Sequence, residues 1–160
     1  MLAPLHLYLP DERATRALGE QIAAGLQPGS SVYLSGDLGA GKTTLARGVI
    51  QALGFEGKVK SPSYALVEPY TDSRLTLYHF DFFRFRDSQE WQDAGFRECF
   101  NEHAICLVEW PEKVAGLLPP PDLLIRLDIP ATGGRNATLE AETEPGRWCL
   151  NALAHSYSAR

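Results

Sequence analysis

The spacing of hydrophobic and polar residues predicts that strands and helices alternate in the first third of the chain. Residues 5–9 and 31–34 are short apolar runs of the strand type, and Asp11 can cap a helix between them. The apolar positions of this helix share one face and are Ala14, Ala17, Leu18, Ile22 and Leu26. A second helix is predicted over residues 44–53, where apolar residues recur every fourth position.

The rest of the chain continues this pattern and adds an antiparallel element. Strand-like runs at residues 64–70 and 75–82 are separated by about four residues, a spacing that predicts a hairpin. Other predicted strands are 104–110, 123–129 and 137–142; other predicted helices are 88–100 with a break at Gly95, a short one from Pro111, and 147–155. No repeat or domain-scale linker interrupts this order. We therefore predict one α/β domain over residues 1–160, with a mixed sheet that carries a hairpin insertion and is flanked by helices.

The segment from Gly36 to Thr43, between the strand at 31–34 and the helix at 44–53, matches the phosphate-loop pattern G-x-x-x-x-G-K-[ST]. In such a loop, successive backbone N–H groups point into one concavity and bind phosphate oxygens. Lys42 can reach the β- and γ-phosphates, and the hydroxyl of Thr43 is a ligand for Mg²⁺. The pattern predicts a P-loop NTPase-like fold. The residues predicted to bind the nucleoside triphosphate are Asp37, Leu38, Gly39, Ala40, Gly41, Lys42, Thr43 and Thr44.

Two acids end apolar strands at the edge where open α/β sheets bind ligands. Asp81 could hold Mg²⁺ through its water shell, and Glu109 could bind Mg²⁺ or orient the attacking water. The competing interpretations are that Asp81 caps the next turn and that Glu109 is a surface residue at a strand end. Ser-Pro-Ser-Tyr at 61–64 lies in a loop where a switch segment could offer a hydroxyl to Mg²⁺ and the γ-phosphate.

Composition, charge and cysteine spacing argue against several other classes of protein. The chain has 160 residues, of which 44% are hydrophobic and 22% charged, as in ordinary soluble proteins. No apolar run approaches the roughly 18 residues of a membrane span, and residues 1–10 lack a secretory signal pattern, so we expect a cytoplasmic protein without a membrane partner. The net charge of −5 argues against nonspecific nucleic-acid binding. It does not exclude a local strip of basic residues drawn from positions 58–86. The cysteines form no C-x-x-C pair, which argues against a disulfide framework or a cysteine zinc site.

Four segments, taken together and in this order, resemble the TsaE family, the small P-loop ATPases of bacterial tRNA threonylcarbamoyladenosine synthesis. They are Gly-Asp-Leu-Gly-Ala-Gly-Lys-Thr-Thr at 36–44, Ser-Pro-Ser-Tyr at 61–64, His-Phe-Asp-Phe-Phe-Arg at 79–84 and Val-Glu-Trp-Pro-Glu at 108–112. The resemblance covers about residues 5–130. Ser63 stands where the family often has threonine, and Phe83 replaces a frequent tyrosine.

The resemblance implies that the chain binds Mg²⁺ and ATP and hydrolyses ATP in association with homologues of TsaB and TsaD. In the family, TsaD transfers the threonylcarbamoyl group to adenosine 37 of tRNAs that read codons beginning with A. The ATPase supports repeated cycles, and its contact with tRNA is expected to be indirect. Carried over by motif, Lys42 and Thr43 would hold phosphate and Mg²⁺, and Ser63 would be the switch hydroxyl. Asp81 and Glu109 would be the acids next to the metal and the attacking water, so the implied catalytic residues are Lys42, Asp81 and Glu109.

Judged from the residues alone, two other functions are possible. One is a nucleotide-gated binding protein without significant hydrolysis, in which Asp81 and Glu109 serve only as metal ligands. The other is a small-molecule kinase, but the arginine-rich lid that such kinases usually need does not follow the Glu109 strand. Hydrolysis by the chain alone is expected to be slow, because Arg84 is the only candidate for an arginine finger and an ion pair is its alternative use. Trp110 either lies near the nucleotide or covers the end of the sheet.

Overall fold

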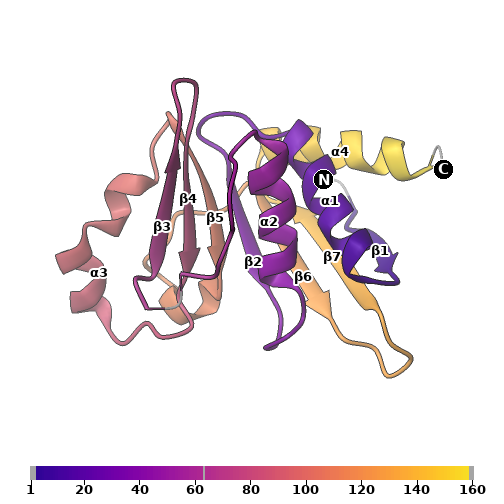
Figure 1. Cartoon of the computed structure of the whole chain (residues 1–160), viewed down its shortest axis with the longest axis horizontal. Coiled ribbons are helices and arrows are strands. Elements are labelled where there is room, and N and C mark those ends of the chain that lie inside the picture. The colour runs from indigo at the N-terminus through magenta and orange to yellow at the C-terminus, as the bar shows by residue number, and fades with distance from the viewer. Residues whose placement is uncertain (1–2, 63, 159–160) are drawn as a thin grey trace.

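The computed structural model describes residues 3–62 and 64–158, and the strands of these residues form one seven-stranded sheet (Figure 1). The strands follow the order β1-β7-β6-β2-β5-β4-β3 across the sheet. Their bounds are Leu5–Leu9 (β1), Ser31–Ser35 (β2), Val67–Thr71 (β3), Thr76–Asp81 (β4), Ala104–Glu109 (β5), Leu123–Asp128 (β6) and Arg135–Ala141 (β7). The central strands β6, β2, β5 and β4 are parallel, whereas β1, β7 and β3 pair antiparallel at the edges. The predicted mixed α/β fold with an antiparallel hairpin is therefore confirmed.

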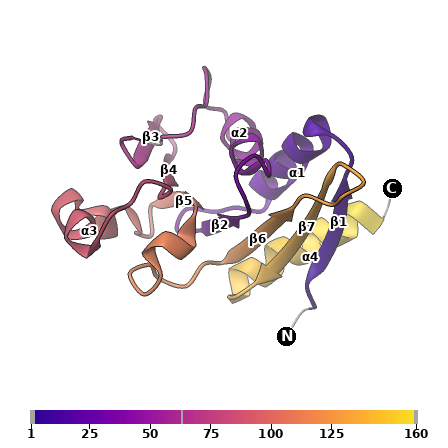
Figure 2. The ribbon, with the colours of Figure 1, turned by 90° about the horizontal axis from the view of Figure 1, so that it is seen from below.

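Helices cover both faces of the sheet (Figure 2). Their bounds are Glu12–Ala24 (α1), Lys42–Ala52 (α2), Ser88–Ala94 (α3) and Glu144–Ser158 (α4), with short 3₁₀ helices at Phe96–Cys99 (η1) and Pro111–Val114 (η2). On one face α1 and α2 bury an aliphatic cluster, and on the other α3 and the 3₁₀ helices enclose an aromatic cluster around Phe80 and Phe82. α4 lies at the end of the sheet opposite the loop that follows β2 (Figure 1). No helix in the described part of the chain has the length and apolar character needed to cross a membrane.

Helices α1 and α2 pack closely because each presents a glycine at their contact. A Cβ atom on Gly19 would lie 2.3 Å from the carbonyl oxygen of Leu45. A Cβ atom on Gly48 would lie 2.2 Å from the carbonyl oxygen of Arg16. Since any side chain would collide with the opposing backbone, only glycine permits this separation. The contact fixes α2, and with it the segment that precedes α2, against α1.

The two predicted acids lie side by side at the ends of β4 and β5. All six residues of β5 are buried, as expected for a parallel strand covered on both faces. On β4, Leu77 belongs to the aliphatic cluster on the α2 side, so His79 and Asp81 face the same side by strand alternation. The parallel register places Asp81 opposite Glu109. Both carboxylates therefore reach the edge of the sheet next to α2.

Some predicted boundaries are wrong by a few residues. The strand expected from residue 64 begins at Val67, because Leu66 has a positive φ of 68° and lies in a turn. The last strand begins earlier than predicted, at Arg135, since its antiparallel pairing with β1 extends to the pair Leu9 and Arg135. This earlier start has a consequence for the site, because it makes Arg135 part of the sheet.

Candidate functional site

The phosphate loop joins the end of β2 to the start of α2, and two of its glycines adopt backbone angles that other residues disfavour. Gly36 has a φ of 147° and Gly41 a φ of 106°. A Cβ atom on Gly36 would lie 2.5 Å from the carbonyl oxygen of Leu127, so β6 also requires glycine here. α2 begins at Lys42, earlier than predicted, directly after the loop. The first N–H groups of the helix therefore face the loop, an arrangement that binds anions.

Lys42 lies in the first turn of α2 and is 4% exposed. Its ammonium group donates hydrogen bonds to the carbonyl oxygens of Gly36 and, at 2.9 Å, Asp37. The Nζ atom lies 4.3 Å from the centre of the Trp110 ring, a cation–π contact that places Trp110 at the site. Burial lowers the pKa of Lys42, and nearby carboxylates, led by Glu109, offset part of that effect. The amine is thus held over the phosphate loop by acceptors of the loop and by an aromatic ring.

The hydroxyl of Thr43 and the carboxylate of Glu109 are in direct contact. Thr43 Oγ1 lies 3.0 Å from Oε1 and 3.1 Å from Oε2 of Glu109, and it donates its proton to this carboxylate. Glu109 is 2% exposed, so the interpretation of Glu109 as a surface residue is wrong. Oε2 also lies 2.6 Å from Nε2 of the buried His79 on β4. The structure thus brings together the phosphate-loop hydroxyl and the acid of the neighbouring strand.

Both carboxylate oxygens of Asp81 accept hydrogen bonds, and one of these is the turn cap that the sequence suggested as the alternative to a metal role. One carboxylate oxygen accepts a hydrogen bond from the N–H of Phe83 at 3.0 Å, so Asp81 caps the turn after β4. The other oxygen accepts a hydrogen bond from the hydroxyl of Ser61. Asp81 is buried and also lines the cavity beside the phosphate loop, which leaves it available as a partner for an ion there.

The loop before β3 reaches the site through Ser61 and Tyr64. Ser63, the predicted switch hydroxyl, lies outside the described residues, and its role stays a prediction. The guanidinium of Arg84 lies 4.7 Å from the centre of the Tyr64 ring. Among residues 3–62 and 64–158, Arg84 forms no salt bridge, so the expected ion pair is not found there. Arg84 instead joins the loop to the turn after β4.

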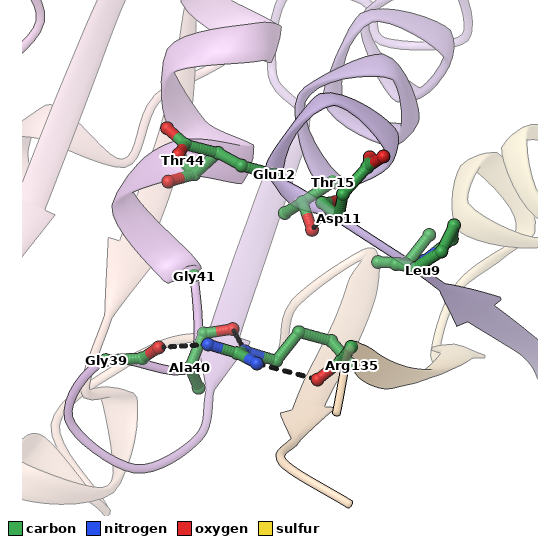
Figure 3. Close-up of a pocket in the computed structure, with 11 residues that line it drawn as sticks. Leu9, Asp11, Glu12, Thr15, Gly39, Ala40, Gly41, Thr44 and Arg135 are labelled. Carbon is green, nitrogen blue, oxygen red and sulfur yellow. Dashed lines mark hydrogen bonds between the residues drawn. The ribbon is translucent and has the colours of Figure 1, made fainter. Parts of the chain in front are cut away.

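Two cavities meet at the phosphate loop. The larger, about 420 Å³, lies toward β4 and β5 and is lined by Leu38–Thr44, Ser61, Asp81, Phe83, Arg84, Glu109 and Trp110. The smaller, about 280 Å³, lies toward α1 (Figure 3). It is lined by Leu9–Glu12, Thr15, Gly39–Gly41, Thr44, Gly134 and Arg135. Because Gly39–Gly41 and Thr44 line both cavities, one elongated ligand can extend along the loop from one into the other.

Arg135 holds the phosphate loop from the side of the smaller cavity (Figure 3). Its Nε atom donates to the carbonyl oxygen of Ala40 at 3.0 Å, and one terminal nitrogen donates to that of Gly39 at 3.0 Å. The other terminal nitrogen donates to the carbonyl oxygen of Gly134 at 2.6 Å. Sequence reasoning missed Arg135 because it lies beyond the matching motifs and reaches the loop only through β7. It also left His79 without a role, although His79 lies within a motif segment.

The oxygen atoms at this site suit Mg²⁺. Thr43, Asp81 and Glu109 offer a hydroxyl and carboxylates, the hard ligands that Mg²⁺ prefers. The described part of the chain contains no group of three or more His, Cys, Asp or Glu that could hold a metal on its own. An ion here would depend on few protein ligands, on water and on phosphate oxygens, which is how Mg²⁺ is usually held beside a nucleotide. The residues present therefore fit a nucleotide-bound Mg²⁺.

Known proteins of one family resemble this chain over most of its length. The family model described as threonylcarbamoyl adenosine biosynthesis protein TsaE matches residues 9–137. The tRNA threonylcarbamoyladenosine biosynthesis protein TsaE of Haemophilus influenzae is 42% identical over 153 residues, which are 92% of this chain and 96% of that protein. The Bacillus subtilis protein of the same name is 38% identical over 132 residues, 82% of this chain and 81% of that protein. The crystal structure of Bacillus subtilis YdiB matches with a TM-score of 0.82 and 30% identity and covers 98% of both chains.

Proposed function

The chain belongs to the TsaE family, and on that premise we propose that it binds and hydrolyses Mg-ATP within the machinery that forms N6-threonylcarbamoyladenosine in tRNA. It acts with homologues of TsaB and TsaD, and tRNA is reached through that complex. The observation that carries the proposal is the contact between Thr43 and Glu109. It joins the phosphate-loop hydroxyl to an acid of the neighbouring strand, the arrangement with which P-loop NTPases hold Mg²⁺ beside the γ-phosphate.

The phosphates are bound by the start of α2 and by Lys42. Loop N–H groups donate to the phosphate oxygens. The Lys42 ammonium exchanges its two carbonyl acceptors, on Gly36 and Asp37, for phosphate oxygens. This exchange is favourable because hydrogen bonds between two charged groups are stronger than those to a neutral carbonyl.

The sugar and base occupy the smaller cavity, beside α1 (Figure 3). A triphosphate whose γ-phosphate lies near Glu109 continues past Thr44, which lines both cavities, toward Asp11 and Thr15. The carboxylate of Asp11 and the hydroxyl of Thr15 offer polar contacts there. The volume of about 280 Å³ is close to the roughly 300 Å³ at the lower end of small-molecule sites.

Residues at the ends of β4 and β5 and at the start of α2 prepare the γ-phosphate for attack by water. Mg²⁺ would be held by the hydroxyl oxygen of Thr43 with Glu109 and Asp81 as acidic partners, and when bound it neutralises charge on the phosphate oxygens. Thr43 can present a lone pair to the ion while its hydroxyl proton stays on Thr43 and is donated to Glu109 in a hydrogen bond. Glu109 orients the water, and Lys42 and the loop N–H groups stabilise charge on the transferring phosphoryl group.

Turnover by the chain alone is expected to be slow. Among the described residues that line the larger cavity, the arginine is Arg84, and its guanidinium lies over Tyr64. An arginine placed on the transferring phosphoryl group contributes roughly 10³–10⁵ in rate. A partner that displaces the Tyr64 loop would free Arg84, or the partner would supply an arginine itself. The partner complex is therefore proposed to complete the site.

One observation favours a second candidate function, nucleotide-gated binding without significant hydrolysis. Both oxygens of Glu109 lie within hydrogen-bond distance of donors, Thr43 and His79. A carboxylate engaged in this way is suited to hold the site together, and it is less available to accept a proton from water. In that case Glu109 and Asp81 would serve only as ligands of the metal ion.

The two functions are separated by phosphate release from Mg-ATP, measured for the chain alone and with a purified TsaB–TsaD pair. Hydrolysis predicts slow release that rises several-fold with the pair. Lys42→Ala should lose ATP binding, whereas Glu109→Ala should bind ATP and lose turnover. Glu102→Ala, which changes a highly exposed acid paired with His103, is the matched control. Binding of ATP without stimulated release would favour the gated-binding function, and absence of binding would contradict both.

A further inference from the structure

His79 is a buried histidine on β4, and its ring makes a single side-chain hydrogen bond. The side chain is 0% exposed and lies on the same face of β4 as Asp81, toward α2. Nε2 lies 2.6 Å from Oε2 of Glu109. Within the described residues, Nδ1 is the only buried side-chain nitrogen or oxygen without a hydrogen-bond partner. The polar chemistry of this ring is therefore directed at Glu109.

The direction of the hydrogen bond follows from the other contacts of Glu109. The carboxylate already accepts the hydroxyl proton of Thr43, at 3.0 and 3.1 Å from its two oxygens. A carboxylate has no proton to donate and can only accept hydrogen bonds. The nitrogen that faces it, Nε2 of His79, therefore carries the ring proton and donates it. A proton on Nδ1 would be a buried donor without an acceptor in the described structure.

Packing alone does not explain a histidine at this position. The strands β4 and β5 are already joined by backbone pairing between Thr76–Asp81 and Ala104–Glu109. An unpartnered Nδ1 in the interior costs free energy that an aliphatic side chain would not. The histidine offsets this cost through the hydrogen bond that Nε2 donates to Glu109, which an aliphatic side chain could not make.

We propose that His79 is a positioning residue that fixes the orientation of the Glu109 carboxylate, an inference that rests on the proposed function. The last torsion of a glutamate side chain is soft and has no sharp minima. Thr43, from α2, and His79, from β4, donate to this carboxylate from two different elements and so restrain its rotation. Without the donor from His79, the carboxylate keeps one anchor and turns away from the orientation that serves Thr43 and the ion. His79 does not line the cavity beside the phosphate loop, so it acts through Glu109.

Three variants separate the donor from the shape of the ring. His79→Gln places an amide N–H donor the same number of bonds from the backbone as Nε2, whereas His79→Asn places it where Nδ1 lies, too short to reach Glu109. His79→Leu fills the space without any donor. Circular dichroism and thermal unfolding establish that each variant is folded; if Asn does not fold, the comparison of Gln with Leu decides.

The readout is equilibrium binding of a fluorescent ATP analogue as Mg²⁺ is titrated, with a parallel titration in the metal chelator EDTA. We expect His79→Asn and His79→Leu to raise the Mg²⁺ concentration for half-maximal binding by about 10–100-fold, the usual effect of losing a partner of a metal-site residue. His79→Gln should restore most of this loss, and binding in EDTA should be equal in all four proteins because the phosphate loop is intact.

The possible outcomes distinguish this inference from the proposed function. Equal Mg²⁺ requirements in all four proteins would overturn the role of His79 and leave the proposed function standing. Equal losses in all three variants, with weaker binding in EDTA as well, would show that His79 serves only the folded structure. A wild-type chain that binds no ATP would overturn the proposed function and the role of His79 with it.

Discussion

Replacing Arg135 by methionine should weaken ATP binding through the backbone of the phosphate loop. The guanidinium donates to the carbonyl oxygens of Ala40 and Gly39, each at 3.0 Å. The C=O and N–H of one peptide point in opposite directions. The contact at Ala40 therefore fixes the direction of the Gly41 N–H, which points away from Arg135. Methionine retains a long apolar stem but removes every N–H donor, so the loop loses this restraint.

The size of the effect follows from the two hydrogen bonds to the loop. A hydrogen bond with a charged partner contributes roughly 1.5–3 kcal/mol when it is well buried. Arg135 is only partly buried, so solvent screening reduces the combined contribution of the two hydrogen bonds to about 1–2 kcal/mol. Since about 1.4 kcal/mol corresponds to a factor of ten in an equilibrium constant, the Kd for ATP should rise about 5- to 30-fold.

Isothermal titration calorimetry with ATP measures this change directly. Arg135→Lys should give an intermediate Kd, because a single ammonium group cannot span the two carbonyl oxygens as a planar guanidinium does. Arg147→Met, which changes an exposed arginine on α4, is the matched control and should bind like wild type. A folded Arg135→Met protein with the wild-type Kd would refute the view that Arg135 orders the loop for phosphate.

Two further predictions test the packing of α2 and the loop before β3. Gly48→Ala should lower the free energy of unfolding by about 1–3 kcal/mol through overpacking against α1. Urea denaturation measures this loss, with Gln51→Ala on the exposed face of α2 as the control. A loss no larger than that of Gln51→Ala would contradict the close contact. Ser61→Ala should reduce partner-stimulated phosphate release but leave the Kd for ATP unchanged, because Ser61 holds the loop to Asp81. Ser61→Thr, which keeps the hydroxyl, should retain turnover, and full turnover in Ser61→Ala would show that the contact is dispensable.

The parts of the fold and site that could be predicted have local signals. The pattern around Lys42 predicts a glycine turn between a strand and a helix, and the structure has this turn between β2 and α2. The apolar run at 104–110 predicts a strand, and β5 forms there with all six residues buried. The short link after the strand-like run at 64–70 predicts the hairpin, and β3 pairs with β4 in antiparallel fashion.

The parts that could not be predicted depend on how distant strands pair. Arg135 reaches the phosphate loop because β7 lies between β1 and β6, an order that no local pattern contains. The contact of His79 with Glu109 requires the parallel register of β4 and β5, in which His79 pairs with Leu107. A shift of that register by one residue would move His79 to the opposite face of the sheet relative to Glu109. Roles that arise from such pairing become visible only in the folded structure.

The proposed function is tested most directly by counting the threonylcarbamoyladenosine formed per TsaD molecule in a reconstituted reaction. The mixture contains a purified TsaB–TsaD pair, tRNA, a threonylcarbamoyl donor, Mg-ATP and this chain. We predict that the wild-type chain sustains repeated rounds, whereas Lys42→Ala, or omission of the chain, limits the product to the first round. The proposed role would be contradicted if repeated rounds continued at the wild-type level without the chain or with Lys42→Ala.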